Sequence, residues 1–166
     1  MRLSVKKIIN APGEREKFDY SMDLSHVDFS GSCPASRPVS VVGQVENIAG
    51  MLLLDMQVST VLDTACDRCG KPLEKELEFT VQYMLADELQ NEENEEILLL
   101  TDGELDLDEL VFTEFVLRMD TKTLCSEECK GLCSKCGANL NDGPCTCQKD
   151  VDPRLAVLAK LLEKKD

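Results

Sequence analysis

Four closely spaced cysteine pairs constrain the fold of this chain more than any other feature. They lie in a sequence of 166 residues that contains nine cysteines. The pairs are Cys66-x2-Cys69, Cys125-x3-Cys129, Cys133-x2-Cys136 and Cys145-x-Cys147, and Cys33 stands alone. Two such pairs brought together by the fold supply the four thiolates of a tetrahedral zinc site. The sequence therefore predicts a segment that one or two structural zinc ions hold in place.

Eight paired cysteines allow two four-cysteine sites. The first predicted site is local and consists of Cys133, Cys136, Cys145 and Cys147. The second joins distant segments and consists of Cys66, Cys69, Cys125 and Cys129. A metal at the second site would fasten a β-turn to the C-terminal part of the chain. The one-residue spacing of the last pair is tight, so replacement of one of its members by Cys125 or Cys129 stays an alternative.

The sequence Cys-x2-Cys-Gly occurs twice, at 66–70 and at 133–137. In such a turn the backbone amides can point at the sulfurs, and glycine tolerates the conformation needed after the second ligand. Lys130, Lys135 and Arg68 lie nearby in the sequence and can offset thiolate charge. Both turns therefore favour metal ligation.

Other chemistry uses similar cysteine spacings. Cys129-x3-Cys133-x2-Cys136 matches the spacing that holds the iron–sulfur cluster of radical S-adenosylmethionine enzymes, but only thirty residues follow Cys136, too few for the α/β barrel of that class. A simple structural iron–sulfur cluster is a second alternative. Thioredoxin-like redox chemistry at Cys66 and Cys69 is a third, although that motif normally opens a helix and here it joins two strands. Reduced cysteines without metal are the fourth.

The first half of the chain has the pattern of a β-sheet. Segments 39–46, 51–62 and 73–85 combine β-branched residues with partial alternation, a turn is expected at 47–50, and 18–24 can add a strand. Consecutive strands with short connections form an antiparallel meander. We therefore predict an α+β fold, in which an antiparallel β-meander or partial barrel precedes a cysteine-rich zinc-knuckle segment and a terminal helix.

The sequence predicts two parts along the chain. Residues 1–118 form a β-rich core domain, with an acidic loop at 86–96, an edge strand or helix lead-in at 97–100 and a helix at about 107–117 capped by Asp106 or Asp108. Residues 119–166 form the cysteine-rich metal-binding segment and a C-terminal helix. That helix has Asp152 as its N-cap and Pro153 at its first position. Its apolar positions follow helical spacing at Leu155, Leu158, Ala159 and Leu162.

The net charge of −14 is concentrated in one stretch. Fourteen acidic residues lie between Glu76 and Glu114, and no Lys or Arg occurs from 76 to 117. This stretch is either a solvated acidic face or a docking surface for a basic partner such as a ribosomal protein.

The sequence shows no signal for secretion, membrane insertion or catalysis. No apolar segment follows the basic residues at the N-terminus, and no apolar run has the length of a membrane span. We therefore expect a cytoplasmic protein without a membrane partner. His26 is the only histidine, and no phosphate-binding loop or nucleophile–base pair is present. The sequence thus predicts neither an enzyme nor a small-molecule substrate.

The order of the cysteine motifs carries a resemblance. The motif Cys66-Asp67-Arg68-Cys69 is followed by Cys-Ser-Glu-Glu-Cys-Lys-Gly-Leu-Cys at 125–133, Cys-Gly-Ala-Asn-Leu-Asn at 136–141 and Asp-Pro-Arg-Leu-Ala-Val-Leu at 152–158. This arrangement resembles the bacterial YceD-like family, named for large ribosomal RNA subunit accumulation, in its cysteine-rich Gram-positive-type form. The resemblance covers essentially the whole chain.

The resemblance implies a non-enzymatic role in large-subunit ribosome biogenesis, supporting accumulation of large-subunit (23S) ribosomal RNA. Other branches of the family lack much of the C-terminal cysteine cluster, which implies that metal there is structural. The implied partner is a ribosomal RNA precursor or a large-subunit ribosomal protein. The overall acidity weakens direct RNA binding, because phosphate affinity depends on cationic contacts. An acidic interaction protein, or chaperone, for a basic ribosomal protein is therefore the alternative.

Overall fold

The computed structural model describes residues 1–29, 31–86 and 97–147. In these residues it has seven strands and one helix. They are β1 (Arg2–Ser4), β2 (Arg15–Met22), β3 (Val39–Ile48), β4 (Met51–Ala65), β5 (Pro72–Ala86), β6 (Ile97–Leu99), β7 (Glu104–Asp106) and α1 (Leu107–Arg118). The predicted C-terminal helix and nearly all of the predicted acidic loop lie outside the described residues.

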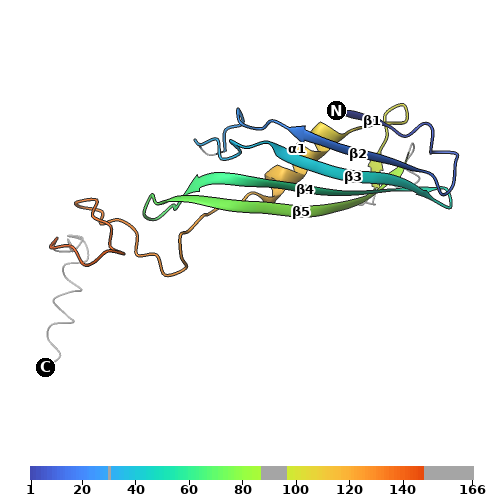
Figure 1. Ribbon diagram of the computed structural model, residues 1–166. Helices are drawn as coiled ribbons and strands as arrows, with labels where there is room; N and C mark the ends of the chain where they lie inside the picture. Colours follow the sequence, from blue (N-terminus) through green and yellow to red (C-terminus); the bar gives the residue numbers. More distant parts are fainter. Residues whose placement is uncertain (30, 87–96, 148–166) are drawn as a thin grey trace, which may run out of the picture.

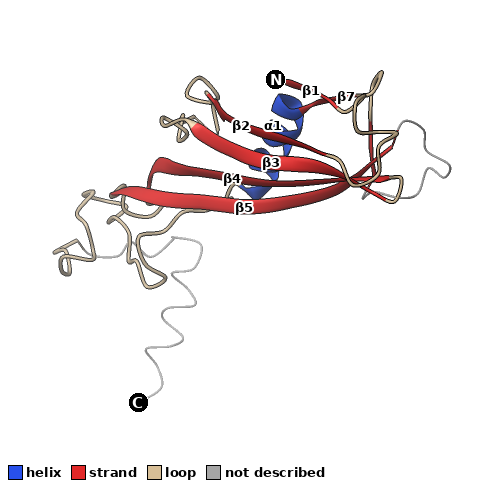
Figure 2. Cartoon of the chain, turned by 45° about the vertical axis from the view of Figure 1, so that its right-hand side comes forward, coloured by secondary structure: helices blue, strands red, loops and turns tan. Residues whose placement is uncertain are grey.

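A curled five-stranded sheet in the order β2-β3-β4-β5-β6 dominates the fold (Figure 1). Strands β2 to β5 form the predicted antiparallel meander. The exception is β6, which pairs in parallel with the end of β5. The long central strands β4 and β5 have 15 residues each. The sheet is a half-barrel, and α1 crosses its strands (Figure 2).

The β3–β4 turn explains the sharp reversal predicted near 47–50. Ala49 and Gly50 have φ of 54° and 95°, as a two-residue hairpin turn of the primed type requires. The side chain of Asn47 accepts from the Gly50 N–H at 2.8 Å and donates to the carbonyls of Ile8 and Ile9 at 2.7 and 2.9 Å. Asn47 is fully buried, so these bonds replace its hydration and fix residues 8–9 to the sheet.

The core lies between the concave face of the sheet and α1. Alternate residues of each strand point inward, as a period of two requires. Gly43 occupies an inward position on β3, where an added Cβ would lie 2.6 Å from Cζ of Phe18 and 2.6 Å from the carbonyl oxygen of Asp55. The missing side chain therefore makes room for the Phe18 ring on β2.

Helix α1 begins at the predicted cap. The carboxylate of Asp106 accepts from the N–H groups of Asp108 and Glu109 at 3.2 and 3.3 Å. Leu107, Val111 and Phe115 are fully buried against the sheet. Leu117, an apolar residue of the predicted helix at 107–117, is 72% exposed.

Glu114 is a buried acid, which its place in the acidic stretch of the sequence did not indicate. Its side chain lies on the buried face of α1 and is 3% exposed. The carboxylate accepts from the Tyr83 hydroxyl at 2.6 Å and pairs with Arg118. Both partners satisfy the buried charge, which would otherwise be costly.

The N-terminal strand β1 pairs with β7 in a separate two-stranded sheet. This pairing brings the Met1 ammonium to the Asp108 carboxylate. No helix within 1–29, 31–86 and 97–147 is long and apolar enough to cross a membrane.

Candidate metal centres

The turn between β4 and β5 presents the first cysteine pair at one end of the sheet. The N–H of Gly70 donates to the carbonyl of Cys66 at 2.8 Å, and the N–H of Cys66 donates to the carbonyl of Lys71 at 2.8 Å. Gly70 has φ of +69°, the conformation that glycine was expected to supply. Cys66 and Cys69 are therefore placed by a tight knuckle between two strands, whereas a thioredoxin-like motif would open a helix.

The segment after α1 crosses to this turn and supplies the second pair (Figure 1). Asp67 and Thr123 are joined twice: the N–H of Asp67 donates to the carbonyl of Thr123 at 2.9 Å, and the N–H of Thr123 donates to the Asp67 carboxylate at 2.6 Å. The Arg68 guanidinium donates to the carbonyls of Glu127 and Cys129 at 3.1 and 2.8 Å. These bonds position the second pair independently of any metal.

Gly131 allows the closest approach between the two segments. Its φ is +73°, and an added Cβ would lie 2.9 Å from the carbonyl oxygen of Arg68. The next residue, Leu132, donates its N–H to that same carbonyl at 3.1 Å. A side chain at 131 would therefore separate the backbone from the β4–β5 turn.

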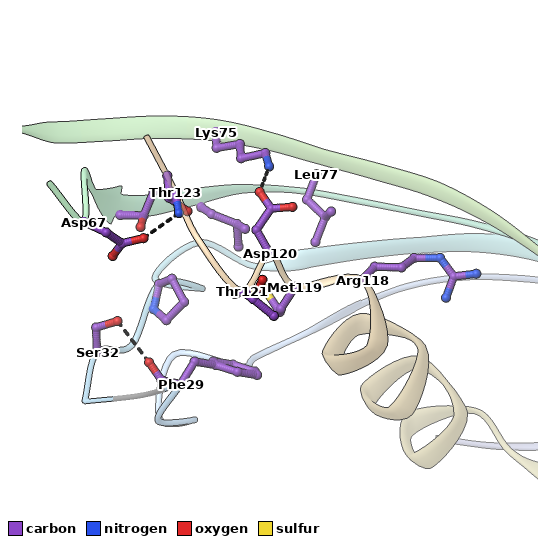
Figure 3. Close-up of a pocket in the computed structure, with 13 residues that line it drawn as sticks. Phe29, Ser32, Asp67, Lys75, Leu77, Arg118, Met119, Asp120, Thr121 and Thr123 are labelled. Carbon is purple, nitrogen blue, oxygen red and sulfur yellow. Dashed lines mark hydrogen bonds and ion pairs between the residues drawn. The ribbon is translucent and has the colours of Figure 1, made fainter. Parts of the chain in front are cut away.

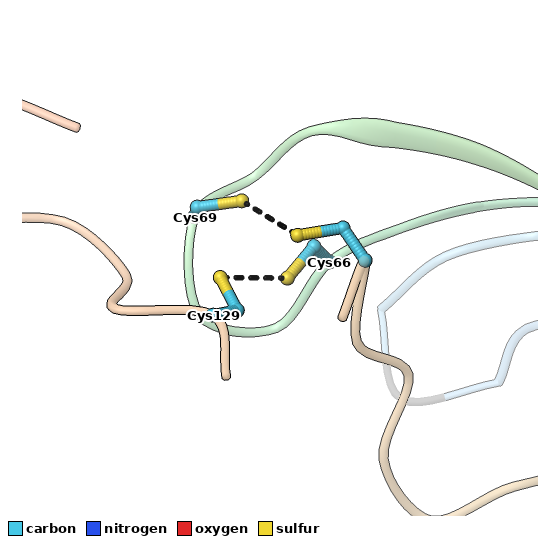
Figure 4. Close-up of side chains that lie close together, drawn as sticks. Cys66, Cys69 and Cys129 are labelled. Atoms are coloured by element: carbon cyan, nitrogen blue, oxygen red, sulfur yellow. Dashed lines mark hydrogen bonds between the residues drawn. The ribbon is translucent and has the colours of Figure 1, made fainter. Parts of the chain in front are cut away.

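The four sulfurs of Cys66, Cys69, Cys125 and Cys129 lie within 4.8 Å of one another. Figure 4 shows the labelled side chains converging from the two segments. The Sγ atoms of Cys66 and Cys129 are 3.8 Å apart, and those of Cys69 and Cys125 are 3.6 Å apart. A tetrahedral ion with bonds of about 2.3 Å to sulfur needs sulfur–sulfur distances of about 3.8 Å. The sulfur spacing therefore fits such an ion.

Burial and hydrogen bonding act in opposite directions on the pKa of Cys66 and in the same direction on the pKa of Cys125. Burial disfavours the Cys66 thiolate, but backbone N–H donors outweigh burial and lower the pKa of Cys66 to about 6. The donors belong to Cys125, Arg68 and Cys69. In contrast, the hydrogen bond to Cys129, and then burial, raise the pKa of Cys125 to about 12. Four thiolates so close together repel one another, and a dication is the group that would offset their charge.

The second group repeats the same knuckle. The N–H of Gly137 donates to the carbonyl of Cys133 at 2.9 Å, the N–H of Cys133 donates to the carbonyl of Ala138 at 2.8 Å, and Gly137 has φ of +72°. The four sulfurs of Cys133, Cys136, Cys145 and Cys147 lie within 4.8 Å of one another.

This second group is more open to solvent than the first. Cys136 is exposed and its three companions are half-buried, whereas Cys66 and Cys129 of the first group are buried. The N–H groups of Cys136 and Lys135 lower the pKa of Cys133 to about 6. The hydrogen bond to Cys136, and then burial, raise the pKa of Cys147 to about 12.

The two groups are connected through Asn141, which sequence reasoning missed. Its side-chain amide donates to Sγ of Cys129 at 3.3 Å, and its side-chain oxygen accepts from the Lys130 N–H at 2.8 Å. Nearby, the N–H of Leu140 donates to the carbonyl of Gly131 at 2.9 Å. A loop of the second group therefore supports a sulfur of the first, and no spacing rule in the sequence marks an asparagine for this role.

The structure brings together the same two sets of four cysteines that the sequence assigned to two ions. Each set can hold a metal ion, but ligation itself and the identity of the ion stay predictions. Cys33 is exposed and belongs to neither group. His26 is exposed, as expected.

A pocket of about 320 Å3 lies beside the first group, under the segment that leaves α1 (Figure 3). Two cations line it, Lys75 and Arg118. Lys75 pairs with Asp120, and Arg118 pairs with Glu114 and lies over the Phe79 ring, 4.6 Å from its centroid. Because a carboxylate pairs with each of these cations, the pocket offers no evident anion site.

A family sequence model and several known proteins match this chain. The sequence model of the family described as large ribosomal RNA subunit accumulation protein YceD matches residues 54–162. This match includes both cysteine groups.

Three relatives give the extent of the similarity. A protein named large ribosomal RNA subunit accumulation protein YCED homolog 1, chloroplastic, from Arabidopsis thaliana, is 28% identical over 147 residues, covering 70% of this chain and 46% of the relative. Its Zea mays counterpart of the same name is 26% identical, covering 84% of this chain and 59% of the relative. A Mycobacterium tuberculosis protein described as uncharacterized is also 26% identical, covering 72% of this chain and 59% of the relative.

The chain thus spans about half the length of these relatives. No solved structure matches it. Since the family match covers well over half of the residues and includes both candidate metal centres, the chain belongs to the YceD family of large ribosomal RNA subunit accumulation proteins.

Proposed function

We propose that this chain is a non-enzymatic factor of large-subunit ribosome biogenesis that supports accumulation of large-subunit (23S) ribosomal RNA in the cytoplasm. The observation that carries the proposal is the family match over residues 54–162, whose family is named for this role. The natural partner is a ribosomal RNA precursor or a large-subunit ribosomal protein. Neither a membrane nor a small-molecule substrate takes part.

Zinc, in this proposal, is a structural cofactor at both cysteine groups. Sulfur spacings of 3.6 and 3.8 Å in the first group support this choice, because they suit four thiolates around one ion. A site with four protein ligands is closed, whereas catalytic zinc keeps a position for water or substrate. The metal would therefore hold residues 119–147 against the β4–β5 turn and supply no reaction chemistry.

The proposed function is tested by depleting the chain in the organism that encodes it and measuring both large ribosomal RNAs. We expect 23S ribosomal RNA to fall relative to 16S ribosomal RNA, and the wild-type chain to restore the ratio. A variant with Cys66 and Cys69 both replaced by Ser should restore it less well than Cys33→Ser, the control outside both groups. An unchanged 23S to 16S ratio after depletion would contradict the proposal.

A second candidate function is that of an acidic interaction protein, or chaperone, for a basic ribosomal protein. It is favoured by the absence of Lys and Arg from 76 to 117, a stretch that includes most of α1. Purification from cell extract with and without RNase separates the two mechanisms. Recovery of an identified ribosomal protein that resists RNase supports this candidate, and recovery that depends on RNA contradicts it.

A further inference from the structure

A groove of mixed polarity lies between α1, β6 and β7, away from the cysteine groups. Its volume is about 660 Å3, and Tyr83 of β5 is one of the residues that line it. Leucines from three elements line it: Leu98 and Leu99 of β6, Leu105 of β7, and Leu110 and Leu117 of α1. These five leucines form the aliphatic part of the lining, and apart from Tyr83 the other lining residues are polar or charged.

Two of these leucines are unusually exposed. Leu117 is 72% exposed and Leu99 is 50% exposed, so water contacts most of the Leu117 side chain. On the same helix, Phe112 and Val116 are 37% and 40% exposed, although neither lines the groove. Several exposed large apolar side chains in and near one groove, unlike a single exposed leucine, favour an interaction site here.

The rim of the groove is negatively charged. Five carboxylates line it against two cations, Arg2 and Lys6. These cations make weak ion pairs at 3.5 Å with Asp106 and Glu104. The carboxylates of Asp102 and Glu109 form no ion pair with any residue in the described part of the chain. The groove therefore combines aliphatic lining with uncompensated negative charge.

Three kinds of occupant can be compared on charge. A nucleic acid phosphate backbone would be repelled by the carboxylates. A second copy of this chain carries the same net charge of −14, which opposes self-association. A segment with lysine or arginine beside leucine-like side chains complements both the rim and the lining. Amphipathic helices bind protein grooves in this way, with apolar anchors spaced along one face.

We infer that the groove between α1, β6 and β7 binds a short Lys/Arg-rich amphipathic helix of a partner protein. The inference rests on the second function proposed above and gives it a binding site. Apolar side chains of the helix contact Leu99 and Leu117, while its cations face Glu109 and Asp102. Lysine and arginine contribute through charge complementarity, and the aliphatic contact supplies most of the affinity.

The test uses the full chain and a fluorescent synthetic peptide of lysine and leucine with leucines at helical spacing. Two control peptides have glutamate in place of lysine, or the same residues with the leucines out of helical spacing. Binding is measured by fluorescence anisotropy at low and at physiological salt. We expect saturable binding of the first peptide, and affinity for each control peptide lower by about tenfold or more.

Matched variants locate the binding site. Leu117→Ser and Glu109→Lys change exposed side chains of the groove, and each should weaken peptide binding about tenfold. Val42→Ser and Glu76→Lys make the same chemical changes at exposed positions of β3 and β5, outside the groove, and should leave the affinity unchanged. Circular dichroism of all four variants verifies that the fold is retained.

Three results would overturn the inference: no binding of the lysine–leucine peptide, equal binding of the glutamate peptide, or equal weakening by the control variants. Failure of the proposed function would give a different set of results. If depletion of the chain leaves the 23S to 16S ratio unchanged while the groove variants lose the peptide, the ribosomal role fails and the groove remains. If the ratio falls but no peptide binds, the groove inference fails and the ribosomal role remains.

Discussion

The side-chain amide of Asn141 donates a hydrogen bond to Sγ of Cys129 at 3.3 Å, which links the two cysteine groups. A donor aimed at a sulfur favours its thiolate, the form that binds metal. Asn141→Leu keeps a side chain of similar size and removes the donor. We expect this change to weaken metal binding at the first group by about tenfold, the lower range for residues that support a ligand.

Competition with a chromophoric zinc chelator measures this effect. The Cys129→Ser variant lacks a ligand of the first group, so the ion that it still binds is held by the second group. The additional ion that wild type binds therefore belongs to the first group. Asp142→Asn, a change at the adjacent exposed residue, is the control and should not alter either affinity. Identical affinities for Asn141→Leu and wild type would mean that the contact contributes nothing to metal binding.

Cys133→Ser tests the predicted division of the chain into 1–118 and 119–166. The second cysteine group loses a ligand, and its loop contacts to Gly131 and Lys130 should loosen. We expect hydrogen exchange to accelerate in 119–147 while strands β3 and β4 retain their protection, because the sheet core is formed by other residues. Cys33→Ser should change neither part. Equal loss of protection in both parts would show one cooperative unit.

Asn47→Leu should destabilise the whole fold. Leucine has a similar size, but the carbonyls of Ile8 and Ile9 and the N–H of Gly50 lose their partner in a buried place. We expect the free energy of unfolding to fall by about 2–4 kcal/mol. Urea unfolding followed by circular dichroism measures it. Asn10→Leu, at an exposed position nearby, should change stability by less than about 0.5 kcal/mol.

Asp106 gives the fold a dependence on pH. The N–H of Glu109 lowers the pKa of the Asp106 carboxyl most, and burial opposes it only in part. A carboxyl whose pKa is lowered by folding stabilises the folded state above its unfolded pKa of about 3.9, and this contribution disappears as pH falls through the lower folded value.

Asp106→Asn preserves a good helix cap and removes only the charge. Wild type should therefore be the more stable protein at pH 7, and the difference should vanish in acid. Urea unfolding of both proteins at a series of pH values measures this, with Asp142→Asn as the exposed control. A stability difference that stays constant from pH 7 into acid would refute the assignment.

The sequence predicted the elements that rest on local patterns. Alternating residues from 39 to 85 indicated the meander, and Asp106 and Asp108 were the two predicted caps, of which Asp106 caps α1, because periodicity and capping are local properties. Strands β1 and β7 were missed, since each has three residues and their pairing joins distant parts of the chain. The parallel pairing of β6 with β5 has no local signal either.

The candidate site shows the same limit. Pair spacing indicated which cysteines act together, because two residues between ligands suit one turn. The roles of Asn141 and Glu114 depend on which segments the fold brings side by side, and single-residue chemistry does not reveal them. The exposure of Leu117 was also unexpected, since an apolar residue near the end of an amphipathic helix normally faces the core.

The length of β5 sets a fixed spacing between the two ends of the molecule. Strand β5 runs from beside the Cys66–Cys69 turn to its pairing with β6 at Met84. At about 3.3 Å per residue, the strand measures about 40 Å between these points, and because the sheet is curled the direct distance is at most this. The sheet would therefore hold a partner of the cysteine-rich end and a partner of the leucine-lined groove at a set distance from each other. Both partners could then be bound at the same time.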